Sequence, residues 1–280
     1  MPPTPNPSHF RRAVIVIPAR LSSQRLPRKM LLADTGKPLV QHTWEAASKA
    51  TQAGQVVVAT DSDEIAAAVA GFGGTAVMTS PAAPSGTARI VEALPQFPDA
   101  EVIVNVQGDE PELAPAAIDL AIDLLARCPE AGIATLVTPL RSRDDLAAPS
   151  AVKAVLTPWR ERSSGGEWTG PGVAGAWRAI TFSRAPVPAA RDWSDALLAA
   201  ALPLYWQHVG LYAYRRSVLE QWEQLPESRL AALESLEQLR AIEAGVPIVA
   251  GAIDHAARGI DTPQDYAAFV ARRYSFTRSK

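Results

Sequence analysis

The sequence has a single cysteine and no long apolar run, which excludes several classes of protein. Cys128 is the one thiol among 280 residues, so an intramolecular disulfide cannot form. No stretch approaches the ~18 uninterrupted apolar residues of a membrane span. Residues 1–12 are rich in proline and lack the apolar centre of a signal peptide. These absences indicate a cytoplasmic protein with a loose leader and no membrane partner.

The chain also has no large excess of either charge. It carries 27 lysines and arginines against 29 aspartates and glutamates, for a formal net charge of −2. Nucleic acids attract broadly basic surfaces, so this balance argues against a nucleic-acid partner. Any basic cluster must therefore be explained as a local site.

Short β-branched runs alternate with alanine- and leucine-rich stretches of helical period. This order predicts an α/β fold with a mostly parallel nucleotide-binding sheet, followed by a smaller mixed α/β lobe. Strands are predicted at residues 13–18, 55–60, 75–78, 101–107, 132–139, 152–156, 178–183, 208–214 and 248–252. Helices are predicted at residues 38–50, 62–72, 86–94, 113–127, 215–224, 233–245 and 263–273.

The predicted organisation is one domain over residues 13–275, between the leader 1–12 and a tail at 276–280. The smaller lobe is expected around residues 140–215. Within it, residues 158–177 break every period and are dense in glycine, serine and tryptophan. We interpret this segment as a tolerated surface insertion between two paired strands.

The first predicted strand leads into a loop that is rich in cations and free of acids. Residues 14–29 read VIVIPARLSSQRLPRK and contain Arg20, Arg25, Arg28 and Lys29. Open α/β sheets bind ligands at the carboxyl ends of their strands, and guanidinium groups suit phosphate oxygens. Neither GxxxxGK[ST] nor GxGxxG follows the strand, so side chains must supply most of the contacts. The loop therefore predicts a polyphosphate site.

Two acidic segments complement this loop. The predicted strand in 102–113, VIVNVQGDEPEL, is stopped by its proline, which places Gln107 and Asp109 at a carboxyl edge. Asp261 lies just before a threonine-proline pair that would cap the next helix. Carboxylates of this kind hold Mg²⁺ that bridges substrate phosphates. If Asp109 and Asp261 meet, they could share the metal ions of a nucleotide site.

Other features are ambiguous by themselves. Ser85 and Gly86 precede a helix whose amide end could receive an anion or a base carbonyl. Arg184 follows a strand, and His208 and Tyr212 share one face of another. A lone histidine at a strand start is more often structural than functional.

The predicted helix 233–245 also has an ordinary explanation. Glu234 and Gln238 are four residues apart, and Glu237 and Arg240 are three apart. Such spacings suit a solvated face crossed by salt bridges.

Taken in order, the motifs resemble those of the 3-deoxy-manno-octulosonate (Kdo) cytidylyltransferases, the CMP-Kdo synthetases. The resemblance runs from about Ala13 to Tyr274. It is carried by VIPARxxSxRLPxK, ATDxxxI, SGTxR, VNVQGDEP, FSRAxxP, HxGxYxYR, LExLEQLR and GxDTPxD. The family fold is an α/β nucleotide-binding domain with a smaller inserted lobe that forms a homodimer.

The resemblance implies that CTP and Kdo are converted to CMP-Kdo and pyrophosphate, for lipopolysaccharide precursor synthesis. It implies Mg²⁺ on Asp109 and Asp261, with Arg20 and Lys29 as their catalytic partners. The implied CTP-binding residues are Pro18, Ala19, Arg20, Arg25, Lys29, Ser85, Gly86, Arg89 and Gln107. The implied sugar-binding residues are Arg184, His208, Tyr212, Glu237 and Gln238.

The chain departs from the family pattern at a few positions. Ala83 and Ala88 stand where the family has histidine and glutamate, and Ala231 replaces an acid. Arg28 replaces a glycine in the first loop. These changes leave open another sugar acceptor, such as 8-amino-Kdo or a sialate-like acid, and a catalytically silent nucleotide-sugar binding protein. The choice of CTP over UTP and the general base also stay open, as does any role of Trp159, Trp168 and Trp177.

Overall fold

The computed structural model describes residues 12–162, 168–169 and 172–278. The chain divides into two compact units, one of Met1–Asp119 with Ala257–Lys280 and one of Leu120–Ala256. The second unit is longer than the lobe expected around residues 140–215. The predicted leader, except for its last residue, lies outside the described residues, as do parts of the predicted insertion and tail.

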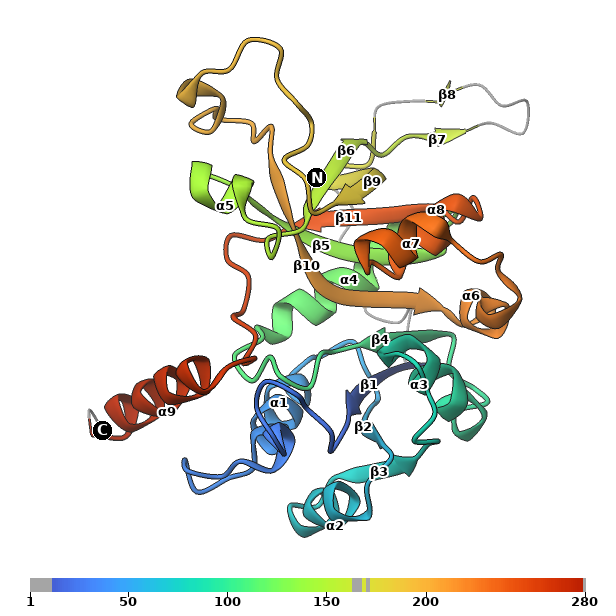
Figure 1. Cartoon of the computed structure of the whole chain (residues 1–280). Helices are drawn as coiled ribbons and strands as arrows, with labels where there is room; N and C mark the ends of the chain where they lie inside the picture. The colour runs from blue at the N-terminus through green and yellow to red at the C-terminus, as the bar shows by residue number, and fades with distance from the viewer. Residues whose placement is uncertain (1–11, 163–167, 170–171, 279–280) are drawn as a thin grey trace, which may run out of the picture. The chain divides into compact units, whose positions relative to one another are not determined.

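The first unit is built on a parallel sheet of four strands in the order β3-β2-β1-β4 (Figure 1). These are β1 (Ala13–Ala19), β2 (Gln55–Thr60), β3 (Thr75–Met78) and β4 (Val102–Asn105). In β1 every residue except Pro18 is buried, as expected of a strand covered on both faces. Ala19 pairs with Thr60 and Val16 with Asn105, so all carboxyl ends meet at one edge.

Helices of the first unit connect these strands. They are η1 (Lys29–Leu31), α1 (Leu39–Ala47), α2 (Asp63–Gly71), α3 (Gly86–Ala93) and η2 (Leu94–Gln96). Helix α9 (Pro263–Arg278) also belongs to this unit, but it follows the second unit in the sequence. Ser62 caps α2 by accepting a hydrogen bond from the Ile65 amide, and Ser85 caps α3 in the same way. These caps fix where two helices begin at the edge that carries the strand ends.

The second unit contains a mixed sheet in the order β10-β5-β11-β9-β6. Strand β10 also pairs with β6, so the first and last strands of this order are hydrogen-bonded to each other. The strands are β5 (Ile133–Pro139), β6 (Lys153–Pro158), β9 (Ala176–Ser183), β10 (Trp206–Arg215) and β11 (Ile248–Ala252). Among the described strand pairs of this sheet, β5 and β11 are parallel and the others are antiparallel. The predicted α/β class is confirmed, and the sheet is mixed.

Short helices surround this sheet. They are α5 (Arg143–Ala147), η3 (Asp195–Leu197), α6 (Arg216–Glu220), η4 (Trp222–Gln224), α7 (Arg229–Glu234) and α8 (Gln238–Glu243). The longer α4 (Pro115–Arg127) crosses the boundary between the two units in the sequence. Most predicted elements are found, with ends that differ by a few residues.

The predicted single helix over residues 233–245 is wrong. Helix α7 ends at Glu234, Ser235 adopts a left-handed conformation with φ 51°, and α8 begins at Gln238. The Glu234 carboxylate accepts hydrogen bonds from the Ser183 hydroxyl and the Arg184 amide. Glu234 therefore binds β9 instead of belonging to a solvated salt-bridged face. The predicted helix 215–224 is likewise divided into α6 and η4.

The predicted insertion is anchored to the second unit at its start. Trp159 is fully buried, although the composition of the segment predicts a surface loop. Its amide donates to Ala176 O at 3.0 Å, and its ring lies 5.1 Å from the Arg178 guanidinium. Two short strands, β7 (Glu161–Arg162) and β8 (Trp168–Thr169), pair beyond it. The segment is therefore partly built into the sheet.

Candidate functional site

A buried lysine joins two aspartates at the carboxyl edge of the first unit's sheet. Lys29 Nζ donates to Asp109 Oδ2 at 2.6 Å and to Asp261 Oδ1 at 3.1 Å. Arg25 pairs with the other oxygen of Asp261 at 3.0 Å. The Lys29 side chain is only 9% exposed, so these carboxylates replace water as the partners of its ammonium group. Four residues predicted from three separate motifs thus form one cluster.

A close backbone approach brings Asp109 to this position. Val106 N donates to Val16 O beyond the end of β4, so the chain continues beside β1. A β-carbon on Gly108 would lie 2.9 Å from Pro18 O, a distance that real β-carbons do not adopt. Glycine is therefore required for the strand ends to approach. Thr43 Oγ1 then holds Gly108 O at 2.8 Å.

Asp261 is held by the start of α9 and by the segment that carries Asp109. Ile260 N donates to Asp109 O at 2.9 Å, which links the two acidic segments directly. Asp265 accepts hydrogen bonds from the Asp261 amide and from both the amide and hydroxyl of Thr262. The Thr262 hydroxyl in turn accepts from Asp265 N at 3.2 Å, which confirms the predicted cap.

The donor set of this cluster fits Mg²⁺. Asp109 and Asp261 offer hard carboxylate oxygens, and Mg²⁺ needs only one or two of these because it keeps several waters. Within the described residues, no group of three or more histidine, cysteine, aspartate or glutamate side chains is arranged as a metal site. Burial and the charge of Asp109 raise the pKa of Glu110 to about 8. At neutral pH Glu110 is therefore mostly protonated and adds little negative charge.

The other two cations of the loop differ in what they contact. Arg28 adopts a left-handed conformation with φ 55°, and its guanidinium pairs with Glu64 on α2. Arg20 directly follows β1 and has no side-chain hydrogen bond or ion pair with any residue that the structure describes. Arg20 is thus available for an anion, whereas Arg28 is engaged with α2.

Residues of the SGTAR motif lie at the same edge. A β-carbon on Gly86 would lie 3.6 Å from Pro18 Cγ, so the start of α3 lies beside the end of β1. Arg89 is fully buried, and it pairs with Asp61 at 2.8 Å and with the Thr79 hydroxyl. Its predicted role in binding CTP stays a prediction, while its contacts join α3 to the residues directly after β2 and β3. Asp61 belongs to the ATDxxxI motif but has no predicted role, although an acid directly after a strand is a usable signal.

Gln107 lies two residues after the end of β4 and is half-buried. Its carbonyl accepts a hydrogen bond from Glu110 N at 3.1 Å, which closes the turn that presents Asp109. Pro18 and Ala19 end β1 at the same edge. Every residue predicted to bind CTP or Mg²⁺ therefore belongs to the first unit.

In the second unit, Arg184 is bound to backbone carbonyls. Its guanidinium donates to Glu234 O at 2.6 Å, to Pro149 O at 3.0 Å and to Ser235 O at 3.4 Å. These bonds hold the break between α7 and α8 against the end of β9. Glu234 itself is a contact that the sequence did not reveal, because its spacing from Gln238 resembles that of a solvated helix.

His208 and Tyr212 lie together on β10, with ring centroids 5.3 Å apart. Burial lowers the pKa of His208 to about 3, so the imidazole is neutral. Its Nε2 lies 2.9 Å from the Thr135 hydroxyl, which donates to Leu211 O at 2.8 Å. Because a hydroxyl has one proton, Nε2 is the donor toward Thr135. The predicted pair is confirmed as neighbours, despite a register shift between Val209 and Tyr212.

Gln238 is 4% exposed at the start of α8, directly after Glu237. Among the residues that the structure describes, its Nε2 finds no hydrogen-bond partner. A buried amide nitrogen left in this way is costly unless a ligand or water accepts from it.

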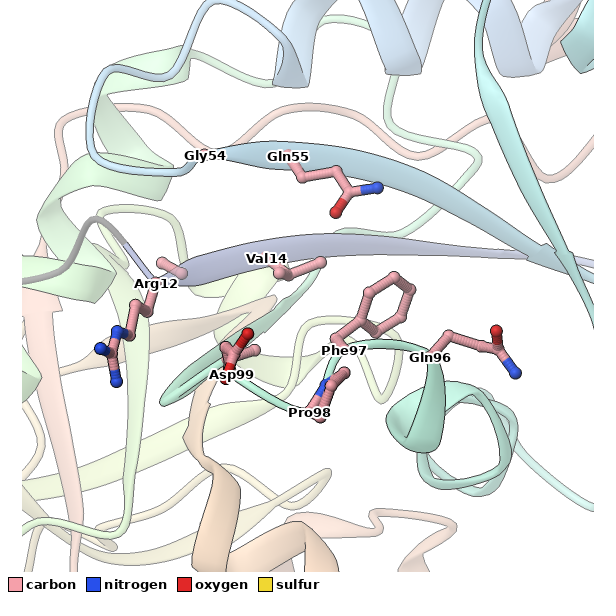
Figure 2. Close-up of a pocket in the computed structure, with 10 residues that line it drawn as sticks. Arg12, Val14, Gly54, Gln55, Gln96, Phe97, Pro98 and Asp99 are labelled. Carbon is pink, nitrogen blue, oxygen red and sulfur yellow. The ribbon is translucent and has the colours of Figure 1, made fainter.

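A pocket of about 320 Å³ lies elsewhere in the first unit (Figure 2). It opens at the amino ends of β1 and β2, at the opposite edge of the sheet from Lys29. It is lined by Arg12, Ala13, Val14, Gly54, Gln55, Gln96, Phe97, Pro98, Asp99 and Ala100. Its position separates it from the cluster of cations and acids.

The part of the chain that the structure describes contains no helix long and apolar enough to cross a membrane.

The fold is that of a nucleotidyltransferase, and a family comparison defines the class further. The cytidylyltransferase family profile matches residues 14–248. A 3-deoxy-manno-octulosonate cytidylyltransferase of Rhodopirellula baltica is 48% identical over 262 residues, covering 93% of this chain and 98% of the relative. This chain belongs to the family of 3-deoxy-manno-octulosonate cytidylyltransferases, which confirms the resemblance seen in the motifs.

Two further comparisons agree. The Geobacter sulfurreducens protein of the same name is 42% identical over 254 residues, covering 89% of this chain and 94% of the relative. A solved structure of a CMP:2-keto-3-deoxy-manno-octonic acid synthetase complexed with CTP has a TM-score of 0.80 and 37% identity, and covers 96% of this chain and 100% of that one. The solved structure of a cytidylyltransferase from Leptospira borgpetersenii aligns over 94% of this chain and 86% of that one, with a TM-score of 0.56. At 16% identity, this likeness shows a shared fold alone.

Proposed function

We propose that this enzyme joins CTP to Kdo and releases pyrophosphate. The observation that carries this proposal is the Lys29–Asp109–Asp261 cluster at the carboxyl edge of a nucleotide-binding sheet, in a chain of this family. A cluster with both cations and acids suits a triphosphate that arrives with its counterion. A protein that only binds a nucleotide sugar has no need of two metal-ligating acids, which argues against the silent alternative.

The reaction is a substitution at phosphorus. The C2 hydroxyl oxygen of Kdo attacks the α-phosphorus of CTP, forming an O–P bond while the bond to the β-phosphate oxygen breaks. Pyrophosphate leaves with the electron pair, and the hydroxyl proton is lost to solvent or to a base. Arg20, Arg25 and Lys29 neutralise and orient the phosphates, which is most of what such a transfer requires.

Mg²⁺ is the proposed cofactor, held by Asp109 and Asp261. When bound, it would neutralise phosphate charge and lower the pKa of a coordinated hydroxyl. Lys29 holds the two carboxylates close together before a cation binds, and Arg25 pairs with one of them, Asp261.

Sugar recognition is proposed for Arg184, His208, Tyr212, Glu237 and Gln238. The strongest support comes from Gln238, whose buried amide needs an acceptor such as a sugar hydroxyl. Neutral His208 suits hydroxyl groups better than a carboxylate. Arg184 remains the proposed partner of the sugar carboxylate, although its donors also serve backbone carbonyls.

A homodimer in the cytoplasm, serving lipopolysaccharide precursor synthesis, completes the proposal. The second unit exposes large apolar side chains, including Leu233 at 82% and Ile180 at 52%, which would suit a subunit interface. Light scattering during size-exclusion chromatography would give the mass in solution, and a monomeric mass would contradict the dimer.

The decisive experiment is a pyrophosphate-release screen of CTP, UTP, ATP and GTP against a panel of 2-keto sugar acids. We expect release with CTP and Kdo. A higher rate with 8-amino-Kdo or a sialic acid would transfer the same chemistry to another acceptor. Tight CTP binding without release on any sugar acid would instead favour the silent binding protein.

A further inference from the structure

One residue of the first unit is bound through both its backbone groups by two tyrosines of α9. The amide of Asp34 donates to Tyr266 Oη at 3.0 Å, and Tyr274 Oη donates to the Asp34 carbonyl at 2.7 Å. Tyr274 follows Tyr266 by eight residues, roughly two helical turns, so both project from one side of α9. We call this arrangement, Asp34 with Tyr266 and Tyr274, the tyrosine clamp.

The clamp rests on a packed base. Tyr266 is 8% exposed and belongs to an apolar cluster with Leu26, Leu39, Ile260 and Phe269. On the other side, Gly36 N donates to Ala33 O at 2.8 Å, which closes a turn around Asp34. Tyr274 is 55% exposed, so its hydroxyl closes the clamp from outside.

The clamp lies close in sequence to both partners of a site ion pair. Asp34 comes five residues after Lys29, and Tyr266 comes five residues after Asp261. Leu32 N donates to Lys29 O at 3.3 Å, and Tyr266 N donates to Thr262 O at 3.1 Å, so both intervening segments are hydrogen-bonded. The same two segments therefore meet twice, once at the clamp and once at the Lys29–Asp261 contact of 3.1 Å.

We propose that Tyr266 and Tyr274 are positioning residues, which keep Lys29 and Asp261 in reach of each other while substrate binds. This inference rests on the proposed function. When CTP and a cation arrive, Lys29 must exchange carboxylate oxygens for phosphate oxygens, and its ion pairs no longer join the two segments. The clamp does not involve those groups, so it maintains the arrangement through the exchange.

The test compares Tyr266→Phe, Tyr274→Phe and the double variant with the wild type. Calorimetry of Mg²⁺–CTP binding without sugar gives a readout that needs no turnover. We expect the double variant to raise the Kd about tenfold, because binding must then order the two segments that the clamp holds in place in the wild type. Amide exchange at Asp34 should accelerate in Tyr266→Phe and stay slow in Tyr274→Phe, which frees only the carbonyl.

A matched control is Thr51→Val, which removes a 2.9 Å hydrogen bond to Asp119 in the same unit, away from the site. It should lower the Tm about as much as a single Tyr→Phe variant, which also loses one hydrogen bond, and it should leave the Kd unchanged. A double Tyr→Phe variant that loses stability but binds CTP like the wild type would overturn the positioning role. Failure of the wild type itself to bind CTP would refute the proposed function, and the role of the clamp with it.

Discussion

At the scale of single residues, the charged cluster pairs one buried lysine with two partly exposed aspartates. Lys29 is buried and needs a carboxylate, whereas Asp109 and Asp261 are partly exposed and can take another cation. The lysine therefore places the acids, and the acids remain open to ligand. This division of roles makes the effect of each substitution distinct.

Asp109→Asn should reduce CMP-Kdo formation by ~10²-fold or more, because it removes one of the two carboxylates proposed to hold Mg²⁺ beside the reacting phosphates. Lys29 keeps Asp261, so the fold should be retained. Pyrophosphate release with Mg²⁺ measures the first effect and circular dichroism the second. Asp99→Asn, at the opposite edge of the sheet, is the control and should match the wild type. Near wild-type turnover in Asp109→Asn would contradict the assignment.

Arg28→Gly should leave the Michaelis constant for CTP nearly unchanged, because Arg28 faces Glu64 and not the two aspartates. Glycine also accepts the positive φ of 55° without strain, which compensates for the lost ion pair in stability. Arg20→Ala is the comparison variant, and it should strongly reduce the rate of CMP-Kdo formation. Steady-state kinetics at varied CTP decide the matter, and equal losses in the two variants would show that Arg28 contacts phosphate.

His208 predicts a dependence of stability on pH. Its pKa is about 3 in the folded chain and ~6.5 when unfolded, so protons bind preferentially to the unfolded state below pH ~6.5. Its neighbours Thr135 and Phe182 do not titrate, and burial raises the pKa of Tyr212, which stays neutral. This contribution to stability is complete above pH ~6.5 and is lost as the pH falls toward 3.

The expected loss from His208 is ~1.4 kcal/mol for each pH unit below 6.5. Urea unfolding of the wild type and His208→Gln at pH 7 and pH 5 isolates this contribution, because the acids are common to both proteins. The stability difference between the two proteins should shift by about 2 kcal/mol in favour of the variant at pH 5. A difference independent of pH would mean that His208 keeps an ordinary pKa.

At the scale of elements, tertiary contacts explain where the sequence misleads. The β-branched runs of β1, β2 and β11 predict strands correctly because these strands are buried in sheets, where such residues pack well. The break after α7 has no such local signal. It depends on Glu234 reaching β9, some 50 residues away, and periodicity cannot reveal a partner at that distance.

The connection between β6 and β9 offers a test at this scale. Trp159→Ala should lower the free energy of unfolding by ~3–5 kcal/mol, because a fully buried ring leaves a cavity. Exposed Arg160→Ala, one residue further on, should change it by less than ~0.5 kcal/mol. Urea unfolding measures both. Equal small effects would restore the interpretation of the segment as a tolerated insertion from its first residue.

At the scale of the whole chain, motif order carried most of the functional prediction. The meeting of Lys29 with Asp109 follows from elementary topology, since carboxyl ends of parallel strands share an edge. For Asp261 the sequence offers only a conditional meeting with Asp109, and the family resemblance implies that both bind the metal. Arg89 shows the limit of both routes, because neither indicates that its side chain is buried against Asp61.

Ligand binding gives a prediction for the whole molecule. CTP with Mg²⁺ at a hundred times its Kd should stabilise the folded state by ~2.7 kcal/mol through mass action. Scanning calorimetry would show this as a higher unfolding midpoint. If the two units unfold separately, only the transition of the first should move. Asp109→Asn should show a smaller shift, and an undiminished shift would mean that Asp109 contributes nothing to binding.

The first unit is assembled from two stretches of chain, and this bears on its biosynthesis. Lys29 and Asp261 are 232 positions apart, with the entire second unit between them. Because synthesis proceeds from the N-terminus, the four strands of the first sheet leave the ribosome long before Asp261 exists. Until then the ammonium group of Lys29 has one carboxylate, and α9 is absent. A nascent chain can thus fold its sheet early, but its charged cluster is complete only after Asp261 has been synthesised.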